Sequence, residues 1–259
     1  MDDPFALLRL QVEWGADEAI DLDPIDRLRP VEARPAPSPG LAPTVPAAVE
    51  APKTTPSERA MAVAAQAGTL DELRDALSRF DGCALRDTAS NLVFAEGNPA
   101  SPTLIIGEPP GRDEDRGGHP FAGAEGQLLD QMLVSIGLTR GDLMLAPLLP
   151  WRPPGGRPPS PTEIALCLPF LHRLIVLLKP RRMVVFGAIA ARALLPAAPN
   201  RRRGTRDWSD IRIPDMRETL PGLILPGLPD LLKNPSLRRD AWAGLRLLRR
   251  ALDENPPGS

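Results

Sequence analysis

The stretch 103–133 constrains the fold of this chain more than any other. Thr103–Ile106 is a short, apolar, β-branched run, which is typical of a buried strand. Residues 107–126 are rich in glycine, proline and acidic side chains, so we expect a loop without regular structure. From residue 127 apolar residues recur with the spacing of a helix that buries one face. A buried strand, a glycine-rich loop and a packed helix form the arrangement in which α/β proteins bind ligands.

The remaining chain continues this alternation of strand and helix. Apolar runs predict further strands over 89–95, 143–145, 183–186 and 223–225. Helical spacing and capping residues predict helices over 57–67, 69–80, 161–178, 188–195 and 236–252, the third of them kinked or split at Pro169. Residues 196–222 and the loop 226–235 show neither pattern. Such alternation favours an α/β fold, in which helices cover both faces of a parallel sheet.

Composition divides the chain into four parts. Residues 1–28 begin with a short helical pattern, and we interpret them as an N-terminal helical segment. Residues 29–56 are rich in proline and alanine, with eight prolines between positions 30 and 56, which predicts a disordered linker. The folded domain is expected over 57–254, followed by a tail over 255–259.

Charge and cysteine content exclude several classes of protein. The formal net charge is −2, so any surface that binds nucleic acid must be local. The two cysteines are 84 positions apart and suggest no disulfide framework. We find no apolar N-terminal run and no stretch near the ~20 apolar residues of a membrane span. We therefore expect a monomeric, cytoplasmic protein that has no contact with a membrane.

Five blocks of the sequence resemble, in order, the motifs of the iron–sulfur-type (family 4) uracil-DNA glycosylases. They are NLVFAEGNP at 91–99, GEPPGRDEDRGGHPFAGAEGQLLDQML at 107–133, WRPPGGRPPSPTEIALCLPFL at 151–171, VVFGAIAARALL at 184–195 and LLKNPSLRRDAW at 231–242. The resemblance implies a three-layer α/β/α fold with a central four-stranded parallel sheet. It also implies a base-excision repair enzyme, which flips uracil out of DNA and hydrolyses its N-glycosidic bond.

The resemblance assigns roles to residues of the glycine-rich loop. Glu108 matches the motif carboxylate and is the candidate catalytic residue, while Phe121 matches the phenylalanine that stacks on the base. The other base-binding positions implied are Gly107, Pro109, Gly111 and Gly123. The glycines among them would let backbone amides approach the base or a phosphate.

Two positions depart from the family pattern. The asparagine that reads the edge of uracil is replaced by Pro147, which has neither a side-chain amide nor a backbone donor. The histidine that faces the developing oxyanion is replaced by Gly227. His119 and His172 are the two histidines of the chain, and we expect a solvated loop residue and an ordinary helix residue. These changes predict weakened catalysis.

The iron–sulfur cluster of the family is also expected to be lost. Cys83 and Cys167 match two of its four cysteine ligands, but Phe80 and Trp151 occupy the other two positions. Two thiolates cannot hold a four-iron cluster. We therefore expect no cofactor and no metal.

DNA is the partner that the resemblance implies, in single- or double-stranded form and containing uracil. The basic side chains that could contact its phosphates are Arg152, Arg157, Arg202, Arg203 and Lys233, although arginine runs are also common on solvated faces. Three hypotheses remain open at this point: a weakened glycosylase of the nucleoid, an inactive paralogue that binds DNA or a modified base, and an α/β protein that binds a small phosphorylated ligand. The GEPPG loop fits neither a P-loop nor a dinucleotide fingerprint, which disfavours the third hypothesis.

Overall fold

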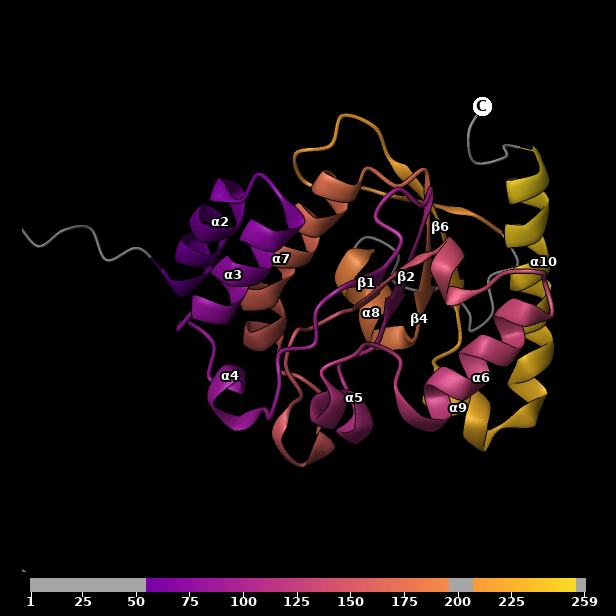
Figure 1. Ribbon diagram of the computed structural model, residues 1–259, viewed down its shortest axis with the longest axis horizontal. Coiled ribbons are helices and arrows are strands. Elements are labelled where there is room, and N and C mark those ends of the chain that lie inside the picture. The colour runs from indigo at the N-terminus through magenta and orange to yellow at the C-terminus, as the bar shows by residue number, and fades with distance from the viewer. Residues whose placement is uncertain (1–54, 196–206, 255–259) are drawn as a thin grey trace, which may run out of the picture. The chain divides into compact units, whose positions relative to one another are not determined.

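The structure is a computed structural model that describes residues 55–195 and 207–254 (Figure 1). All of these residues belong to the second of two units into which the chain divides, Pro52–Ser259. The predicted N-terminal helical segment, nearly all of the linker, the tail and the arginine run at 201–206 lie outside the described residues.

A six-stranded mixed sheet forms the centre of the described unit, in the order β1-β3-β2-β4-β6-β5. Its four central strands run parallel, whereas the edge strands β1 and β5 pair antiparallel with β3 and β6. The strands are β1 (Glu96–Gly97), β2 (Thr103–Gly107), β3 (Met144–Pro147), β4 (Arg182–Phe186), β5 (Ser209–Ile211) and β6 (Leu220–Leu225). The predicted four-stranded parallel sheet is therefore confirmed as the centre of a larger, mixed sheet.

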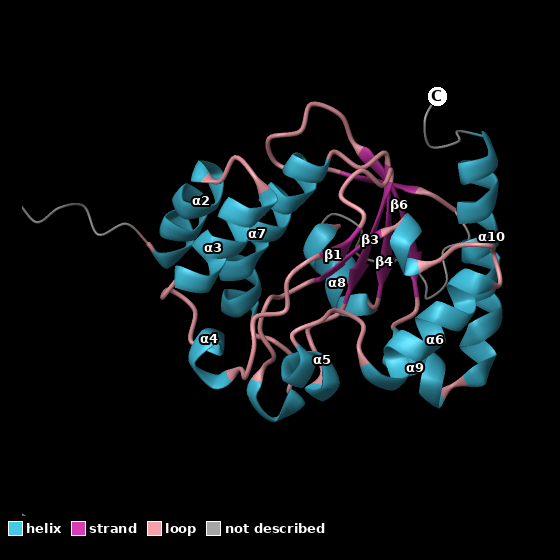
Figure 2. Cartoon of the chain, viewed as in Figure 1, coloured by secondary structure: helices cyan, strands magenta, loops and turns pink. Residues whose placement is uncertain are grey.

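Alternate residues of β2 face two separate hydrophobic layers. Leu104 and Ile106 belong to a cluster formed with α2 (Pro56–Gln66), α3 (Leu70–Arg79), α7 (Pro161–Leu178) and α8 (Ala188–Leu194). Ile105 belongs to a second cluster, formed with α6 (Gly123–Val134), α9 (Leu228–Lys233) and α10 (Arg238–Glu254). Because side chains alternate across a strand, an apolar strand buries both of its faces, which requires helices on each side. Figures 1 and 2 show these layers on opposite sides of the sheet.

Short polar motifs begin several of the helices. Ser160 caps α7 and forms a capping box with Glu163, as the sequence predicts. Thr69 caps α3 by accepting a hydrogen bond from the Glu72 amide. Helix α2 begins at Pro56, one residue before the predicted start at Ser57, and Thr55 and Glu58 form a reciprocal capping box there. Side-chain oxygens thus satisfy backbone donors that would otherwise have no partner in the helix.

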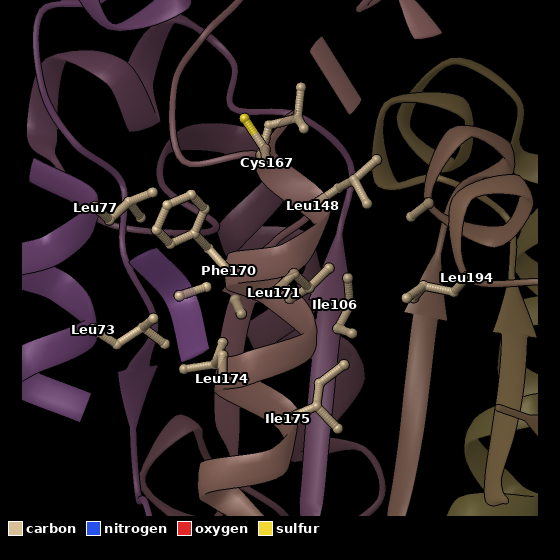
Figure 3. Close-up of a cluster of buried hydrophobic side chains, with 14 of the residues drawn as sticks. Leu73, Leu77, Ile106, Leu148, Cys167, Phe170, Leu171, Leu174, Ile175 and Leu194 are labelled. Carbon is tan, nitrogen blue, oxygen red and sulfur yellow. The ribbon is translucent and has the colours of Figure 1, made fainter. Parts of the chain in front are cut away.

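Helix α7 is the most apolar long helix of the described unit. It runs without interruption through Pro169, so the alternative of a split helix is wrong. With 18 residues and a mean hydropathy of 1.6 it approaches the length and composition of a membrane span more closely than the sequence analysis expected. Its buried side contacts α2 and α3, and Figure 3 shows Phe170 and Leu174 on the side of α3, with Ile175 beside β2. It is the central helix of this core.

Residues 89–95 do not form the predicted strand. Ser90 and Asn91 donate to the Asp115 carboxylate, and Val93 donates to the Pro150 carbonyl. The backbone is thereby held by a side chain and by a loop rather than by a neighbouring strand. Ladder pairing begins only at Glu96, which lies opposite Leu145.

Two predicted loops contain short helices. Within residues 107–126, α5 (Arg112–Gly117) forms because Glu114 accepts the Gly111 amide and acidic residues fill its first turn, where they favour the helix dipole. Helix α6 also begins at Gly123, four residues before the predicted start. Residues 228–233 form α9, which buries Leu228 and Leu231 in the second core cluster.

Candidate functional site

A cavity of about 260 Å³ lies at the carboxyl ends of three parallel strands, where Gly107, Pro147 and Phe186 end β2, β3 and β4. Its walls include α5, the start of α6, the proline-rich loop after β3 and the first turns of α8 and α9. Figure 1 shows α5 at this edge of the sheet. Ligand pockets for drug-sized molecules enclose ~300–1,000 Å³, so this cavity is suited to a smaller ligand such as one flat ring.

Most predicted site residues meet in this cavity. Those that line it are Gly107, Glu108, Pro109, Gly111, Phe121, Arg152 and Arg157. Gly123 and Lys233 do not line it, and Arg202 and Arg203 lie outside the described residues. The sequence motif and the fold therefore bring the carboxylate and the phenylalanine together.

Phe121 has an unusual backbone that its neighbours hold in place. Its φ angle is 54°, a left-handed conformation that is costly for a bulky residue, and its side chain is only 4% exposed. Its amide donates to Glu114 Oε1 at 2.6 Å, and its carbonyl accepts from Arg140 Nη2 at 2.7 Å. Arg140 is itself fixed by Asp130, with Nε and Oδ1 2.6 Å apart. Two charged side chains thus stabilise a conformation that local preferences oppose.

Phe121 occupies space that is free because Gly107 and Gly126 have no Cβ atom. A Cβ atom on Gly107 would lie 2.8 Å from Cζ of the Phe121 ring, and one on Gly126 would overlap the Phe121 carbonyl oxygen. Gly126 lies on α6, and a Cβ atom on it would also lie 2.6 Å from Arg140 Nη2. These glycines permit the ring to lie against the end of β2.

The other two predicted glycines serve the loop itself. The Gly111 amide already donates to Glu114 Oε2 at 2.7 Å, so it is not free to contact a ligand. Gly123 has a φ of 69°, and a Cβ atom there would lie 2.9 Å from Cβ of Asp113. Gly123 therefore lets the start of α6 pack closely against α5, a structural role that the sequence analysis did not assign.

Glu108 follows β2 directly and points its carboxyl group to the start of α8. Burial raises its pKa above the ordinary value, the Ile189 and Ala188 amides lower it by hydrogen bonding, and the charge of Asp230 raises it. A Cβ atom on Gly227 would lie 2.9 Å from Glu108 Oε2. The Glu108 carboxyl group thus lies beside the position that the family resemblance assigns to a histidine.

The polar lining of the cavity consists entirely of charged side chains. Pro147 lines the cavity but offers no amide, and none of the described lining residues is Asn, Gln, His, Ser or Thr. The lining side chains with hydrogen-bonding groups are Glu108, Glu114, Glu125, Arg112, Arg152 and Arg157. Any bound base must therefore be recognised by carboxyl groups, guanidinium groups or the backbone.

Glu125 is a site residue that the sequence analysis missed. It is half-buried on the first turn of α6, and no other described residue forms a hydrogen bond or ion pair with it. Burial raises its pKa to about 7, with further contributions from the charges of Glu114, Glu108 and Asp113, while Lys233 opposes them. The available signal was an acidic residue four positions after Phe121.

The predicted phosphate contacts differ in their availability. Arg157 pairs with Glu163 through two bonds of 2.9 and 2.6 Å, and this pairing lowers the pKa of Glu163 to about 2. Arg152 is half-buried, and its Nε is buried without a hydrogen-bond partner among the described residues. Lys233 is exposed at the end of α9. Of the two arginines after β3, Arg152 is the one with a buried donor that has no partner among the described residues.

Neither histidine lines the cavity. His119 is exposed, and its Nδ1 lies 3.0 Å from Glu96 Oε2. His172 lies on α7, where burial lowers its pKa.

The two cysteines lie next to each other in the core, away from the cavity. Their Sγ atoms are 3.9 Å apart, and Phe80 and Trp151 belong to the same buried cluster. The hydrogen bond with Cys167 lowers the pKa of Cys83 to about 7, and the pKa of Cys167 is raised. The described residues contain no group of three or more His, Cys, Asp or Glu side chains that could hold a metal ion. Two thiols, with Phe80 and Trp151 at the other two positions that the resemblance assigns to ligands, do not fit a four-iron cluster, which needs four ligands.

Comparison with known proteins identifies relatives of this chain. The sequence model of the uracil DNA glycosylase superfamily matches residues 94–246. The type-4 uracil-DNA glycosylase of Pyrobaculum aerophilum is 40% identical over 126 residues, which are 49% of this chain and 64% of that protein. The type-4 enzyme of Archaeoglobus fulgidus is 40% identical over 123 residues, 48% of this chain and 62% of that protein. The chain therefore spans less than two thirds of the length of these relatives.

Proposed function

Because the chain belongs to the uracil-DNA glycosylase superfamily, we propose that it hydrolyses the N-glycosidic bond of a uracil flipped out of DNA, with weakened catalysis. The observation that carries this proposal is that Glu108 and Phe121 line one cavity, sized for a single ring, at the carboxyl ends of the parallel strands. Enzymes that act on a base must take it out of the stack and enclose it in such a pocket.

Each of the two residues has a chemical role in the proposed reaction. The Phe121 ring, fixed by the backbone contacts of Glu114 and Arg140, offers a rigid apolar wall for the base. The Glu108 carboxylate, held by the amides of α8, positions a water molecule or stabilises positive charge on the sugar. The sugar develops that charge as its bond to the base lengthens.

Weakened catalysis is proposed because two polar groups of the family pocket have no equivalent here. Pro147 supplies no amide to read the edge of uracil, and Gly227 supplies no donor to the departing base. Loss of one preorganised oxyanion donor commonly costs ~10²–10³ in rate, or about 2.7–4 kcal/mol.

The same two positions favour a second candidate function, a paralogue that binds DNA or a modified base without cleaving it. In such a complex we expect the guanidinium of Arg152, which lines the cavity, to contact a phosphate. Binding through phosphates falls steeply with salt, by a slope of about −0.9 per neutralised phosphate.

We also propose that the protein acts as a monomer in the cytoplasm and carries no iron–sulfur cluster. The latter proposal is supported by the presence of only two thiols, with Phe80 and Trp151 at the other two ligand positions that the resemblance implies. Iron analysis and the absorbance near 400 nm of the purified protein test it, because stoichiometric iron would contradict it.

An abasic-site assay on uracil-containing oligonucleotides tests the proposed function. We expect slow formation of abasic DNA, abolished by Glu108→Gln, which keeps the shape of the side chain but removes its charge. Glu96→Gln is the matched control, since Glu96 is exposed and lies outside the cavity. Retained DNA binding without any turnover would favour the paralogue instead.

A further inference from the structure

Glu125 faces the cavity that holds Glu108 and Phe121 but comes from a different element, the first turn of α6. It is half-buried and, within the described part of the chain, has no hydrogen-bond or ion-pair partner. It also does not cap its helix, because the start of α6 has no side-chain cap. A half-buried carboxyl group without a structural task, in a cavity, is a candidate for function.

The charges that face Glu125 are mostly negative. The charges of Glu108 at the end of β2 and of Asp113 and Glu114 on α5 raise the pKa of Glu125. The charge of Lys233 on α9 lowers it. Three arginines line the cavity. Arg112 and Arg157 are exposed, and Arg157 is paired with Glu163. Arg152 is half-buried. These surroundings, together with burial, keep a proton on Glu125 up to a pH of about 7.

These negative charges oppose the departure of the base as an anion, and protonation of the base would remove that opposition. When the glycosidic bond breaks, its electron pair stays with the base, which would leave as an anion. The three lining carboxyl groups disfavour an anion, and the described lining offers no neutral side-chain donor. Two of the three lining arginines are exposed, and one of these, Arg157, is paired with Glu163, so their charges offset this effect only in part. A base that receives a proton as it departs carries no such charge.

On the basis of the proposed function, we propose that Glu125 is the general acid of this site, which donates a proton to the base as the base leaves. The bond between C1′ and the base nitrogen breaks, and its electron pair goes to the base. Water adds its oxygen to C1′ and gives a proton to the Glu108 carboxylate, while the Glu125 carboxyl proton goes to the base. The products are an abasic sugar and a neutral base, and both carboxyl groups then exchange their protons with solvent.

The two carboxyl groups would therefore work in opposite protonation states. Burial raises the pKa of both groups, but Glu108 accepts two backbone hydrogen bonds, which favour its charged form, whereas Glu125 accepts none from the described residues. A pair of carboxyl groups in different surroundings, one acid and one base, is a common solution for hydrolysing glycosidic bonds. Glu125 would thus donate a proton to the leaving base, whereas Gly227 has no side-chain donor to stabilise it.

The test compares wild type, Glu125→Gln and Glu125→Asp on DNA containing uracil or 5-fluorouracil, from pH 5.5 to 9. Fluorine stabilises the departing base, so a 5-fluorouracil substrate needs less help from an acid. We expect Glu125→Gln to lower kcat/KM for uracil by ~10²-fold or more, with a clearly smaller loss for 5-fluorouracil and with Glu125→Asp intermediate. The wild-type rate should fall above pH 7, and this fall should be absent in Glu125→Gln. Thermal melting checks that the variants fold, and Glu96→Gln serves as the control carboxyl change.

The possible outcomes separate this inference from the proposed function. If wild type excises the base and Glu125→Gln matches it in rate and pH profile, Glu125 is not the acid, although the proposed function stands. An equal loss on both substrates with an unchanged pH profile would also overturn the acid role and would leave Glu125 as a binding residue. If wild type releases neither base at any pH, the proposed function fails, and the acid role fails with it.

Discussion

Replacing Gly126 by alanine should disturb the cavity by displacing Phe121. Gly126 lies within α6, where alanine is normally favoured over glycine by about 1 kcal/mol. A Cβ atom at this position would overlap the Phe121 carbonyl oxygen and lie 2.6 Å from Arg140 Nη2. Backbone and side chains must therefore move, and the hydrogen bond between Arg140 and the Phe121 carbonyl is the contact most directly broken.

The magnitude follows from the competing effects. A hydrogen bond to a charged group contributes about 1.5–3 kcal/mol, and overpacking a buried site costs typically ~1–3 kcal/mol. These costs exceed the gain in helix propensity, so we expect Gly126→Ala to destabilise the protein by about 2–4 kcal/mol. For a domain of this size such a change lowers Tm by roughly 5–15 °C.

Urea or thermal unfolding of Gly126→Ala measures this effect, with Gly117→Ala as the matched control. Gly117 also lies in a helix, but the nearest atom to an added Cβ is His119 Cδ2, at an ordinary contact distance of 3.8 Å. The control should be neutral or slightly stabilised. Equal stability of the two variants would refute the reasoning that close packing by Gly126 and Arg140 holds the Phe121 backbone.

Three further predictions concern the charges and thiols around the site. The pKa of Glu125 is raised from 4.5 to about 7 in the folded state, so wild type should lose stability as pH rises between these values. Glu125→Gln should therefore have the same free energy of unfolding as wild type at pH 4. At pH 8.5 its free energy of unfolding should exceed that of wild type by on the order of 1–2 kcal/mol after allowing for solvent screening. Equal urea midpoints at pH 8.5 would contradict this. Gly227→His should not restore fast excision, because its Cβ alone would lie 2.9 Å from Glu108 Oε2 and displace that carboxyl group; a faster rate in the abasic-site assay would show that the histidine can be accommodated. Cys83 and Cys167 are both buried, so iodoacetamide should modify the folded protein only slowly. The hydrogen bond with Cys167 lowers the pKa of Cys83 to about 7, so peptide mapping should find Cys83 modified first, and faster at pH 8 than at pH 6. The reverse order would be inconsistent with these thiol environments.

Apolar runs were sufficient to predict the central sheet. Thr103–Ile106, 183–186 and 223–225 each lie within a parallel strand, and 143–145 overlaps β3 from Met144 on, because fully buried strands leave an uninterrupted apolar signal. The Ser160 cap and its partner Glu163 likewise predicted the start of α7 from local chemistry alone. The short edge strands were missed because their residues lack that signal and depend on pairing with a neighbour.

Short helices and tertiary contacts explain the remaining differences. Helix α5 lies in a glycine-rich loop, and its formation depends on Glu114, which also binds the distant Phe121 amide. Residues 89–95 have strand-like composition, but the Asp115 carboxylate accepts hydrogen bonds from the backbone of this segment, which does not pair with a neighbouring strand. Both cases involve side chains that act across the loop, which local patterns do not reveal.

The family motif predicted Glu108 and Phe121 as site residues, and the structure adds Glu125 to the lining of the same cavity. Glu108 and Phe121 were identified from their places in the motif, and they line the same cavity. Glu125 was missed because its importance depends on the carboxyl groups of Glu108 and Glu114, which the fold brings near it. The structural role of Gly123 depends in the same way on Asp113, which packs against it.

Release of free uracil is the most direct test of the account. Full-length protein, in excess over an oligonucleotide with a single uracil, should release that base slowly and leave matched thymine-containing DNA intact, as mass spectrometry can show. Glu108→Gln should release none. Absence of uracil after prolonged incubation with wild type, on both single- and double-stranded DNA, would contradict the claim that this cavity hydrolyses the glycosidic bond.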